Sequence, residues 1–326
     1  MDMAVTVDPL LQHGGRISVA AARYPSAPTP WLDLSTGISP WAYPVDDLDP
    51  ADWQNLPSTD DVAELEIAAA DSFGGVSPDQ IVAVPGTDFA IRLLAQLLHG
   101  DRIGIVGPTY SGYQSAWPEA KTLSFAKAHE ADLLVCANPN NPDGTVIPKA
   151  QLQRLGNLRI VDEAFADASP AQSLLPHRNG AIVLRSFGKF YGLAGLRLGF
   201  VVADGPFAKQ FRALLGDWPI SGPALTIGTK AYRDTEWQFA QRTRLNTASN
   251  RLITLLTDAG LAIVGGTPLF QLARHASASA LITHLAEAGI LTRPFADQPN
   301  WLRFGIPGSD VDFDRLAAAL SDWKSQ

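Results

Sequence analysis

A lysine flanked by a hydroxyl and a guanidinium lies in the second half of the chain. Ser186 precedes Lys189 by three residues and Arg197 follows it by eight, within the glycine-rich stretch from Leu184 to Phe200. A lysine that carries pyridoxal phosphate (PLP) as a Schiff base must lie beside the aldehyde, and the phosphate needs a hydroxyl and a guanidinium nearby. This spacing therefore predicts a PLP site with Lys189 as the point of attachment.

Two other lysine motifs do not fit this stretch. Ser-x-x-Lys also occurs in penicillin-binding folds, but neither Ser-Asp-Asn nor Lys-Thr-Gly follows it here. A phosphate loop of the Walker type needs a glycine where the chain has Val183, and a Ser or Thr where it has Phe190. Both alternatives fail on spacing.

An acid and an amide follow two apolar runs. Asp162 follows 158–161, and its carboxylate can pair with a protonated pyridine nitrogen, which keeps the PLP ring an electron sink. An acid that caps the following turn is an equally common use of an isolated Asp. Asn141 lies in the rigid turn 138–144, after the run 133–137, where it can donate a hydrogen bond to the ring hydroxyl.

Two further segments offer contacts to the cofactor. Gly86, Thr87 and Asp88 open a helix after a strand, so their free backbone amides predict an anion site for the cofactor phosphate. Tyr110 is placed to stack on the pyridine ring. For Tyr113 packing alone is an alternative.

Two arginines in the C-terminal part are candidates for the substrate. Arg303 lies among apolar neighbours on a predicted strand, where a charge needs an anionic partner, and a bidentate clamp on a substrate carboxylate would supply one. Arg293 precedes it by ten residues at the end of another strand. Two arginines suit a substrate with two anionic groups, although structural ion pairs are the alternative for either.

Strands and helices alternate along most of the chain. Strands are predicted at 81–84, 102–106, 133–137, 158–161 and 182–185, with helices at 62–73, 87–98, 111–117 and 148–155. After a helical stretch at 223–259, strands are predicted at 262–264, 269–273, 290–293 and 301–305, with helices at 277–288 and 310–323. Residues 13–44 lack helical periodicity and are read as an irregular arm. The pattern predicts an α/β fold with a mostly parallel sheet and a smaller α+β unit.

The composition of the chain narrows the classes of partner and the cellular location that we expect. The 326 residues carry a net charge of -8 and are 46% hydrophobic, which favours a small-molecule partner over nucleic acid or a membrane surface. The lone Cys136 lies in an apolar run and is expected in the core. Residues 1–16 lack the basic and apolar regions of a signal peptide, so we expect a cytoplasmic protein. No metal site is predicted.

These motifs in this order resemble the fold type I, PLP-dependent class I/II aminotransferase superfamily over nearly the whole chain. The specific marks are 138–144, 162–165 and 186–199. The resemblance implies a large domain with a seven-stranded sheet and the same cofactor roles as above, and it assigns Arg303 to the substrate carboxylate. The expected division is an arm at 1–45 that packs on the small domain, a PLP-binding domain at 46–235 and a small domain at 236–326.

The N-terminal segment narrows the resemblance. His13-Gly-Gly and the segment 31–40, which contains Gly37, look like the threonine-phosphate decarboxylase branch, whose members form aminopropanol phosphate in the cobalamin pathway. The resemblance implies that His13, Gly37 and Arg293 also contact the phosphorylated substrate. It further implies a homodimer with the active site at the subunit interface. Two departures stand out: Phe165 replaces a tyrosine that binds the ring oxygen in many relatives, and Leu56 replaces a tyrosine that reaches the partner's phosphate.

Three functions remain open on the sequence. If the arginines hold a phosphate and the substrate carboxylate is turned out of the ring plane, carbon dioxide leaves. If they hold the carboxylate in the plane, the α-hydrogen leaves and Lys189 moves the proton in transamination, for example of histidinol phosphate. A PLP-binding regulator would need a DNA-binding domain, for which the chain has no room. The N-terminal segment favours decarboxylation.

Overall fold

The computed structural model describes residues 9–46 and 48–324. The expectation that no signal peptide is present concerns residues 1–16, of which the first eight lie outside the described residues. The chain falls into two compact units, one of residues 42–242 and one of residues 1–41 with 243–326. The boundary between the two units after residue 242 falls within helix α11 (Thr235–Asp258). The division at 45 and 235 stays a prediction.

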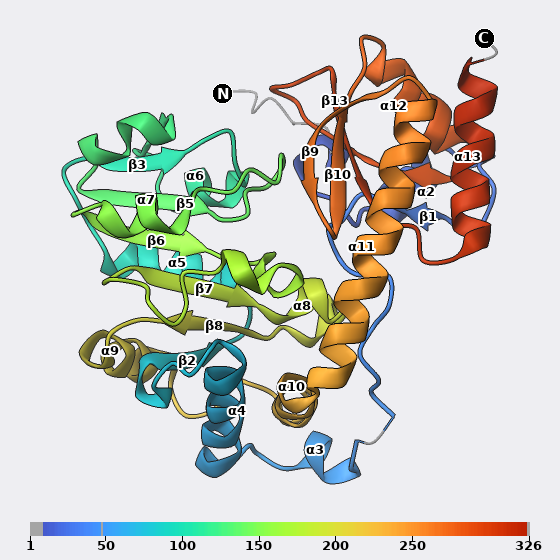
Figure 1. The fold of residues 1–326 in the computed structure, drawn as a ribbon. Helices are drawn as coiled ribbons and strands as arrows, with labels where there is room; N and C mark the ends of the chain where they lie inside the picture. Colours follow the sequence, from blue (N-terminus) through green and yellow to red (C-terminus); the bar gives the residue numbers. More distant parts are fainter. Residues whose placement is uncertain (1–8, 47, 325–326) are drawn as a thin grey trace, which may run out of the picture. The chain divides into compact units, whose positions relative to one another are not determined.

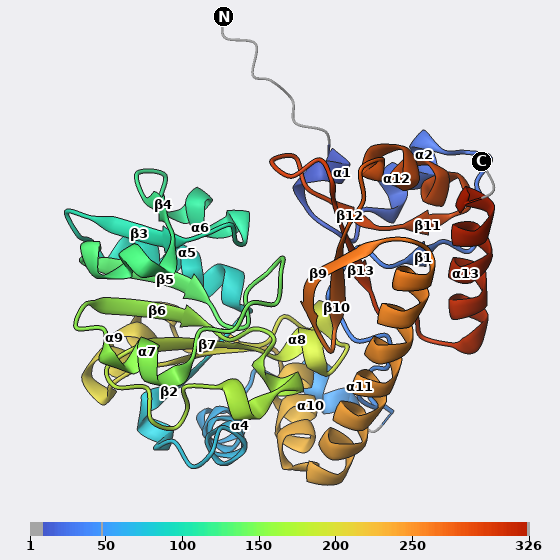
Figure 2. The same ribbon diagram turned by 45° about the horizontal axis from the view of Figure 1, so that its top comes forward.

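The unit of residues 42–242 is built on a seven-stranded sheet (Figure 1). Its strands are β2 (Ile81–Val84), β3 (Ile103–Val106), β4 (Lys121–Leu123), β5 (Leu133–Ala137), β6 (Leu158–Asp162), β7 (Ile182–Ser186) and β8 (Gly199–Val202). The order is β2-β8-β7-β6-β5-β3-β4, with β4 at the edge beside β3 (Figure 2). Only β8 runs antiparallel to the others, so the mostly parallel sheet is confirmed.

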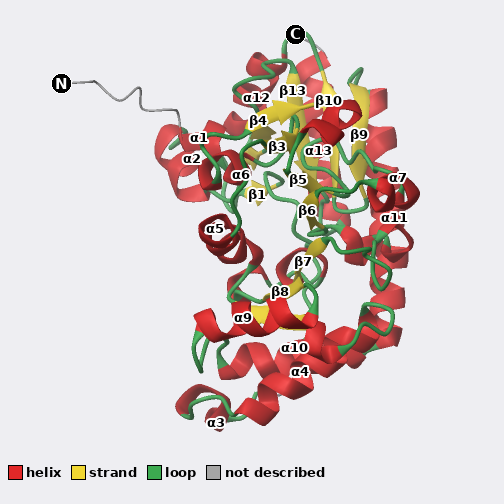
Figure 3. Ribbon diagram, turned by 90° about the vertical axis from the view of Figure 1, so that its left-hand side faces the viewer, coloured by secondary structure: helices red, strands yellow, loops and turns green. Residues whose placement is uncertain are grey.

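Helices cover this sheet because its strands are apolar on both faces. The helices of the unit are α3 (Pro50–Gln54), α4 (Thr59–Ser72), α5 (Thr87–Leu97), α6 (Ser111–Ala116), α7 (Lys149–Arg154), α8 (Phe187–Phe190), α9 (Gly205–Leu215) and α10 (Gly222–Arg233). Residues of α5, α6 and α9 share one core cluster with alternate residues of the strands. Helices α4 and α10 lie side by side, and a Cβ on Gly228 would come 2.8 Å from the Leu65 side chain (Figure 3).

The second unit joins the N-terminal segment to the C-terminal third of the chain. Its elements are α1 (Pro9–Gln12), α2 (Ile17–Arg23), β1 (Leu32–Asp33), β9 (Ala262–Thr267), β10 (Phe270–Arg274), α12 (Ala278–Glu287), β11 (Ile290–Leu291), β12 (Arg293–Pro294), β13 (Trp301–Gly305) and α13 (Asp310–Lys324). Strands β12-β13-β10-β9 form an antiparallel sheet, and β1 pairs with β11. Leu34 packs into the same core cluster as Leu252, Phe304 and Leu316.

Several sequence predictions need correction. Residues 13–44 are not wholly irregular, because they contain α2 and β1; a helix of seven residues is too short to show a periodic apolar face. Strand β8 and helix α9 were not predicted. Helix α4 begins at Thr59, three residues before the predicted start, because Ser58 caps it: its hydroxyl accepts from the Asp61 amide. No helix within the described residues has the length and apolar character needed to cross a membrane.

Candidate functional site

The predicted cofactor residues of the 42–242 unit follow the carboxyl ends of its parallel strands. Since β2, β3, β5, β6 and β7 run in the same direction, the loops after them meet at one edge of the sheet. Gly199, at the start of β8, pairs with Val84 on one side and Ser186 on the other. A Cβ on Gly199 would lie 3.1 Å from the Thr87 amide nitrogen. The start of α5 and Ser186 therefore flank the same glycine.

A cation lies at the start of α5. Gly86 has φ +90°, a conformation that favours glycine, and a Cβ there would come 3.0 Å from Cζ of Arg197. Arg197 is itself left-handed, with φ 55°, and its Nη1 donates to the Ala194 carbonyl at 3.0 Å. Within the described residues Arg197 forms no ion pair. The structure thus brings Gly86, Thr87, Ser186 and Arg197 together in a set of donors suited to a phosphate.

Asp162 ends β6 as a buried carboxylate, 5% exposed. It accepts a hydrogen bond from the Tyr113 hydroxyl at 2.8 Å and from the Ala164 amide at 3.0 Å. Burial raises its pKa, while these hydrogen bonds and the charge of Lys189 lower it. The carboxylate thus accepts from the following turn, which is the capping use, and it also lies near the charge of Lys189; its pairing with a pyridine nitrogen stays a prediction. A protonated ring nitrogen is the kind of cation that such a group fits.

Two tyrosines connect Asp162 to the start of α5. The Tyr110 hydroxyl donates to Asp88 Oδ1 at 3.1 Å, and the rings of Tyr110 and Tyr113 meet edge to face with centroids 5.4 Å apart. Burial, followed by the charge of Asp88, raises the pKa of Tyr110 to about 12, so it stays a neutral donor. Asp88 also pairs with Arg92 at 3.1 Å, and its carboxylate is thus committed within the protein. The sequence offered packing alone for Tyr113, and the structure shows that it binds Asp162.

Lys189 lies in a short helix anchored by aromatic side chains. Phe187 and Tyr191 are fully buried and stack at 4.3 Å, and Tyr191 stacks in turn on Trp237. Gly188 is needed here, because a Cβ on it would come 2.6 Å from Cα of Ala194. The helix backbone is therefore fixed, while the lysine side chain between these anchors remains partly exposed.

Asn141 lies in a turn that its neighbours hold in place. Asn140 donates to the Pro108 carbonyl at 2.9 Å and accepts from the Thr109 hydroxyl at 2.8 Å. Asn138 is buried, and its amide is satisfied by the backbone of Ile147. Asn138 and Asn140 thus hold the turn in place and tie it to the loop that carries Tyr110, which supports Asn141 at the same edge.

A buried network of ion pairs lies next to Asp162 and Ser186, at the edge of the sheet where the parallel strands end. Arg185, next to Ser186, pairs with Glu163 at 3.4 Å and with Asp167, and Glu163 is next to Asp162. Ser173 donates to the Glu163 carboxylate, and the Arg185 guanidinium lies 4.4 Å from the centre of the Phe73 ring. The sequence analysis did not find this network, because the partners of Arg185 are 18 and 22 residues away in sequence and no local spacing links them.

The predicted substrate residues are described in the other unit. Arg293 on β12 and Arg303 on β13 are directly opposite in the antiparallel ladder, so both side chains point to the same face. Arg303 is 6% exposed and donates to the Ser35 carbonyl at 3.0 Å. His13 is exposed and Gly37 is buried in the same unit. Which of these four contact a substrate stays a prediction.

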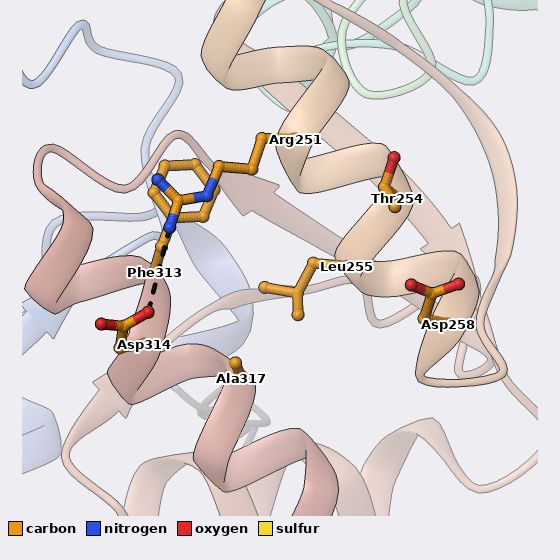
Figure 4. A pocket seen from close by; sticks show the side chains of 7 residues that line it. All are labelled: Arg251, Thr254, Leu255, Asp258, Phe313, Asp314 and Ala317. Atoms are coloured by element: carbon orange, nitrogen blue, oxygen red, sulfur yellow. Dashed lines mark ion pairs between the residues drawn. The ribbon is translucent and has the colours of Figure 1, made fainter.

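A shallow pocket of about 320 Å³ in the second unit lies apart from these residues (Figure 4). It lies between α11 and α13, and its cation, Arg251, already pairs with Asp310 and Asp314 and covers the Phe313 ring at 4.1 Å. Its chemistry is that of a satisfied helix-helix contact. Among the described residues no group of three or more His, Cys, Asp and Glu side chains could hold a metal ion.

Comparison with known proteins identifies the family. Residues 119–320 match the family model for aminotransferase class I and II. The chain belongs to that family. Threonine-phosphate decarboxylase of Pseudomonas aeruginosa is 40% identical over 97% of the chain and 98% of the relative, and that of a Sinorhizobium species is 42% identical over 95% and 97%.

A solved structure confirms the fold. Histidinol-phosphate aminotransferase of Sinorhizobium meliloti, in complex with pyridoxal-5'-phosphate, superposes with a TM-score of 0.82 over 99% of this chain and 98% of that one. At 20% identity this likeness shows the fold alone. The predicted class, a fold type I PLP-dependent transferase with a mostly parallel seven-stranded sheet, is therefore confirmed. PLP is the cofactor that the donors at the strand ends fit.

Proposed function

We propose that this chain is a PLP-dependent decarboxylase that converts L-threonine O-3-phosphate to (R)-1-amino-2-propanol phosphate. The observation that carries the proposal is the similarity, at 40% and 42% identity over nearly the whole chain, to two threonine-phosphate decarboxylases. The pair of opposed arginines in the second unit supports it, because a phosphate dianion is the ligand that two neighbouring guanidinium groups fit best.

The cofactor residues have separate roles in this proposal. Bound PLP supplies an electron sink for the bond that breaks at the substrate's α-carbon. Lys189 would hold the cofactor covalently, and in the complex with substrate its amine would be the group that moves protons at that carbon. Asp162 holds its negative charge at the ring nitrogen, Asn141 donates to the ring oxygen and Tyr110 packs on the ring. The cofactor phosphate is bound by Ser186, by Arg197 and by the backbone amides at the start of α5, which are those of Gly86, Thr87 and Asp88.

The substrate residues select the reaction. If His13, Gly37, Arg293 and Arg303 bind the substrate phosphate, the carboxylate is left outside the guanidinium pair and is the group that leaves. If the arginines bind the carboxylate instead, it is retained and the α-hydrogen leaves. Phosphate recognition by this set therefore separates the decarboxylase from an aminotransferase.

A substrate comparison tests the proposal. We expect purified holoenzyme to release carbon dioxide from threonine phosphate, and to be at least about 100-fold slower on threonine, because a dianion bound by cations in a partly desolvated site contributes several kcal/mol. Amino transfer from histidinol phosphate to 2-oxoglutarate, without carbon dioxide release from threonine phosphate, would establish the aminotransferase alternative instead.

We further propose a cytoplasmic homodimer. Trp53 and Leu56 are each 70% exposed at neighbouring positions, and a second copy of the chain would cover them. Sedimentation should give twice the 34.9 kDa of the chain. Trp53→Asp should shift the protein toward monomer, whereas Val311→Asp, at an equally exposed valine of the other unit, should leave the dimer intact. A monomeric wild type would refute this part of the proposal.

A further inference from the structure

Two arginines of the second unit, one buried (Arg303) and one partly buried (Arg293), lie opposite each other on neighbouring strands. Arg293 and Arg303 are a directly opposed pair in the ladder of β12 and β13, where like charges destabilise a sheet. Arg293 lies over the Phe295 ring at 5.1 Å and donates to the Leu10 carbonyl at 3.4 Å. The N-terminal segment therefore packs on this pair.

The next turn of that segment packs on the pair as well. The Gly15 amide donates to Ser35 Oγ at 2.7 Å, and Arg303 donates to the carbonyl of the same Ser35 at 3.0 Å. Ser35 is buried, and its hydroxyl is fixed by Asp33 Oδ1 at 2.5 Å. A Cβ on Gly14 would come 2.7 Å from the Ser35 carbonyl carbon, so the backbone approaches closely. One residue thus links the turn before Arg16 to Arg303.

The charge of Arg16 acts on Arg293, and the charge of Arg293 acts on Arg303. Burial, and after it the charge of Arg16, lowers the pKa of Arg293 to about 10. Burial, and after it the charge of Arg293, lowers the pKa of Arg303 to about 9. The charge of Arg293 therefore interacts with that of Arg16 and with that of Arg303, and an anion bound among these three side chains would be attracted by all of them.

Helix capping does not explain an arginine at position 16. It is the N-cap residue of α2, where its side chain makes no capping hydrogen bond. A positive charge at a helix N-terminus is also unfavourable, because the backbone amides there are the positive end of the helix. Helix stability would favour Ser, Asp or Asn at this position.

We propose that Arg16 binds the phosphate group of the substrate together with Arg293 and Arg303, as a third cation of that site. This inference rests on the proposed function. With three guanidinium groups the site favours a dianionic phosphate over a carboxylate, which carries a single charge. Arg16 is accordingly a residue that determines specificity for phosphorylated substrates.

Inorganic phosphate provides a test that does not require turnover. We expect Arg16→Gln to weaken phosphate binding to the holoenzyme, measured by calorimetry, by about 10-fold or more, because one charge-assisted contact is lost. The KM for threonine phosphate should rise in parallel, while the visible absorbance of the bound cofactor stays unchanged. Arg23→Gln, which removes an arginine from the other end of α2, is the matched control and should bind phosphate as the wild type does.

The outcomes separate this inference from the proposed function. If Arg16→Gln binds phosphate within threefold of the wild type, or if the wild type binds none at millimolar concentration, the role of Arg16 is refuted. If phosphate binding weakens but the wild type releases no carbon dioxide from threonine phosphate, Arg16 keeps its role and the decarboxylase proposal fails. Should Arg16→Gln not fold, Arg16→Met decides: it keeps the length of the side chain but loses its charge, so unchanged phosphate affinity would overturn the inference.

Discussion

At the scale of single residues, the site depends on a carboxylate that must stay ionised where water is scarce. Burial raises the pKa of Asp162, and the hydrogen bonds from Tyr113 and the Ala164 amide oppose that rise. Tyr113 is itself fully buried, and burial raises the pKa of its hydroxyl well above the usual value, so it remains a donor. The tyrosine therefore helps to keep the acid negative.

Removing that hydroxyl gives a prediction with a definite sign. In Tyr113→Phe the pKa of Asp162 should rise further, so the acidic limb of the pH profile of kcat/KM should move to higher pH. The rate at neutral pH should fall only about 5- to 10-fold, the equivalent of one hydrogen bond. In Asp162→Asn the rate should fall by about three orders of magnitude with the cofactor still bound, since this substitution removes the charge itself. An unshifted acidic limb in Tyr113→Phe would show that Tyr113 only packs.

At the scale of elements, the loop that carries Lys189 is fixed by a close backbone approach. Gly188→Ala should place a methyl group 2.6 Å from Cα of Ala194 and cost about 1 to 3 kcal/mol, with weakened cofactor binding. Gly195→Ala is the control in the same segment, because a Cβ there has nothing within 4 Å. Thermal unfolding and cofactor titration measure both effects. Equal behaviour of the two variants would contradict the role given to Gly188.

The buried ion network gives a second prediction for an element. Arg185→Met should destabilise the fold by about 3 to 5 kcal/mol, because Glu163 and Asp167 are left buried without their cation. Burial already raises the pKa of Glu163 and the charge of Arg185 lowers it, so the loss of Arg185 raises that pKa further. The deficit should therefore shrink as the pH falls and Glu163 becomes protonated. Arg102→Met, in an exposed pair with Asp132, should leave the thermal midpoint unchanged.

The sequence predicts elements well where burial imposes a pattern. The apolar runs of β2, β5 and β6 are fully or mostly buried, so their composition alone indicates strands. Strand β8 was not predicted, because it directly follows the glycine-rich segment of Arg197 and is antiparallel to the other strands. The types and spacing of residues indicate a cofactor-binding set, which stays a prediction. Tyr113 binds Asp162, 49 residues away in sequence, and no local pattern reveals such a contact.

At the scale of the whole molecule, the central claim is the fate of the substrate carboxylate. Both units contribute predicted site residues, the first for the cofactor and the second for the substrate. The chain matches the family model for aminotransferase class I and II and is also similar to two threonine-phosphate decarboxylases, so the proposed distinction between the two reactions is the orientation of the substrate. A direct test must therefore follow the carbon atoms of the substrate and not only its disappearance.

Product analysis in deuterated water makes that test. Holoenzyme given threonine phosphate in D2O should form an amino-alcohol phosphate that has lost one carbon as carbon dioxide and retains its nitrogen. One solvent deuterium should occupy the carbon-bound position from which the carboxylate left, as seen by mass spectrometry and NMR. A product that keeps its carboxylate carbon and loses nitrogen to 2-oxoglutarate would contradict the account.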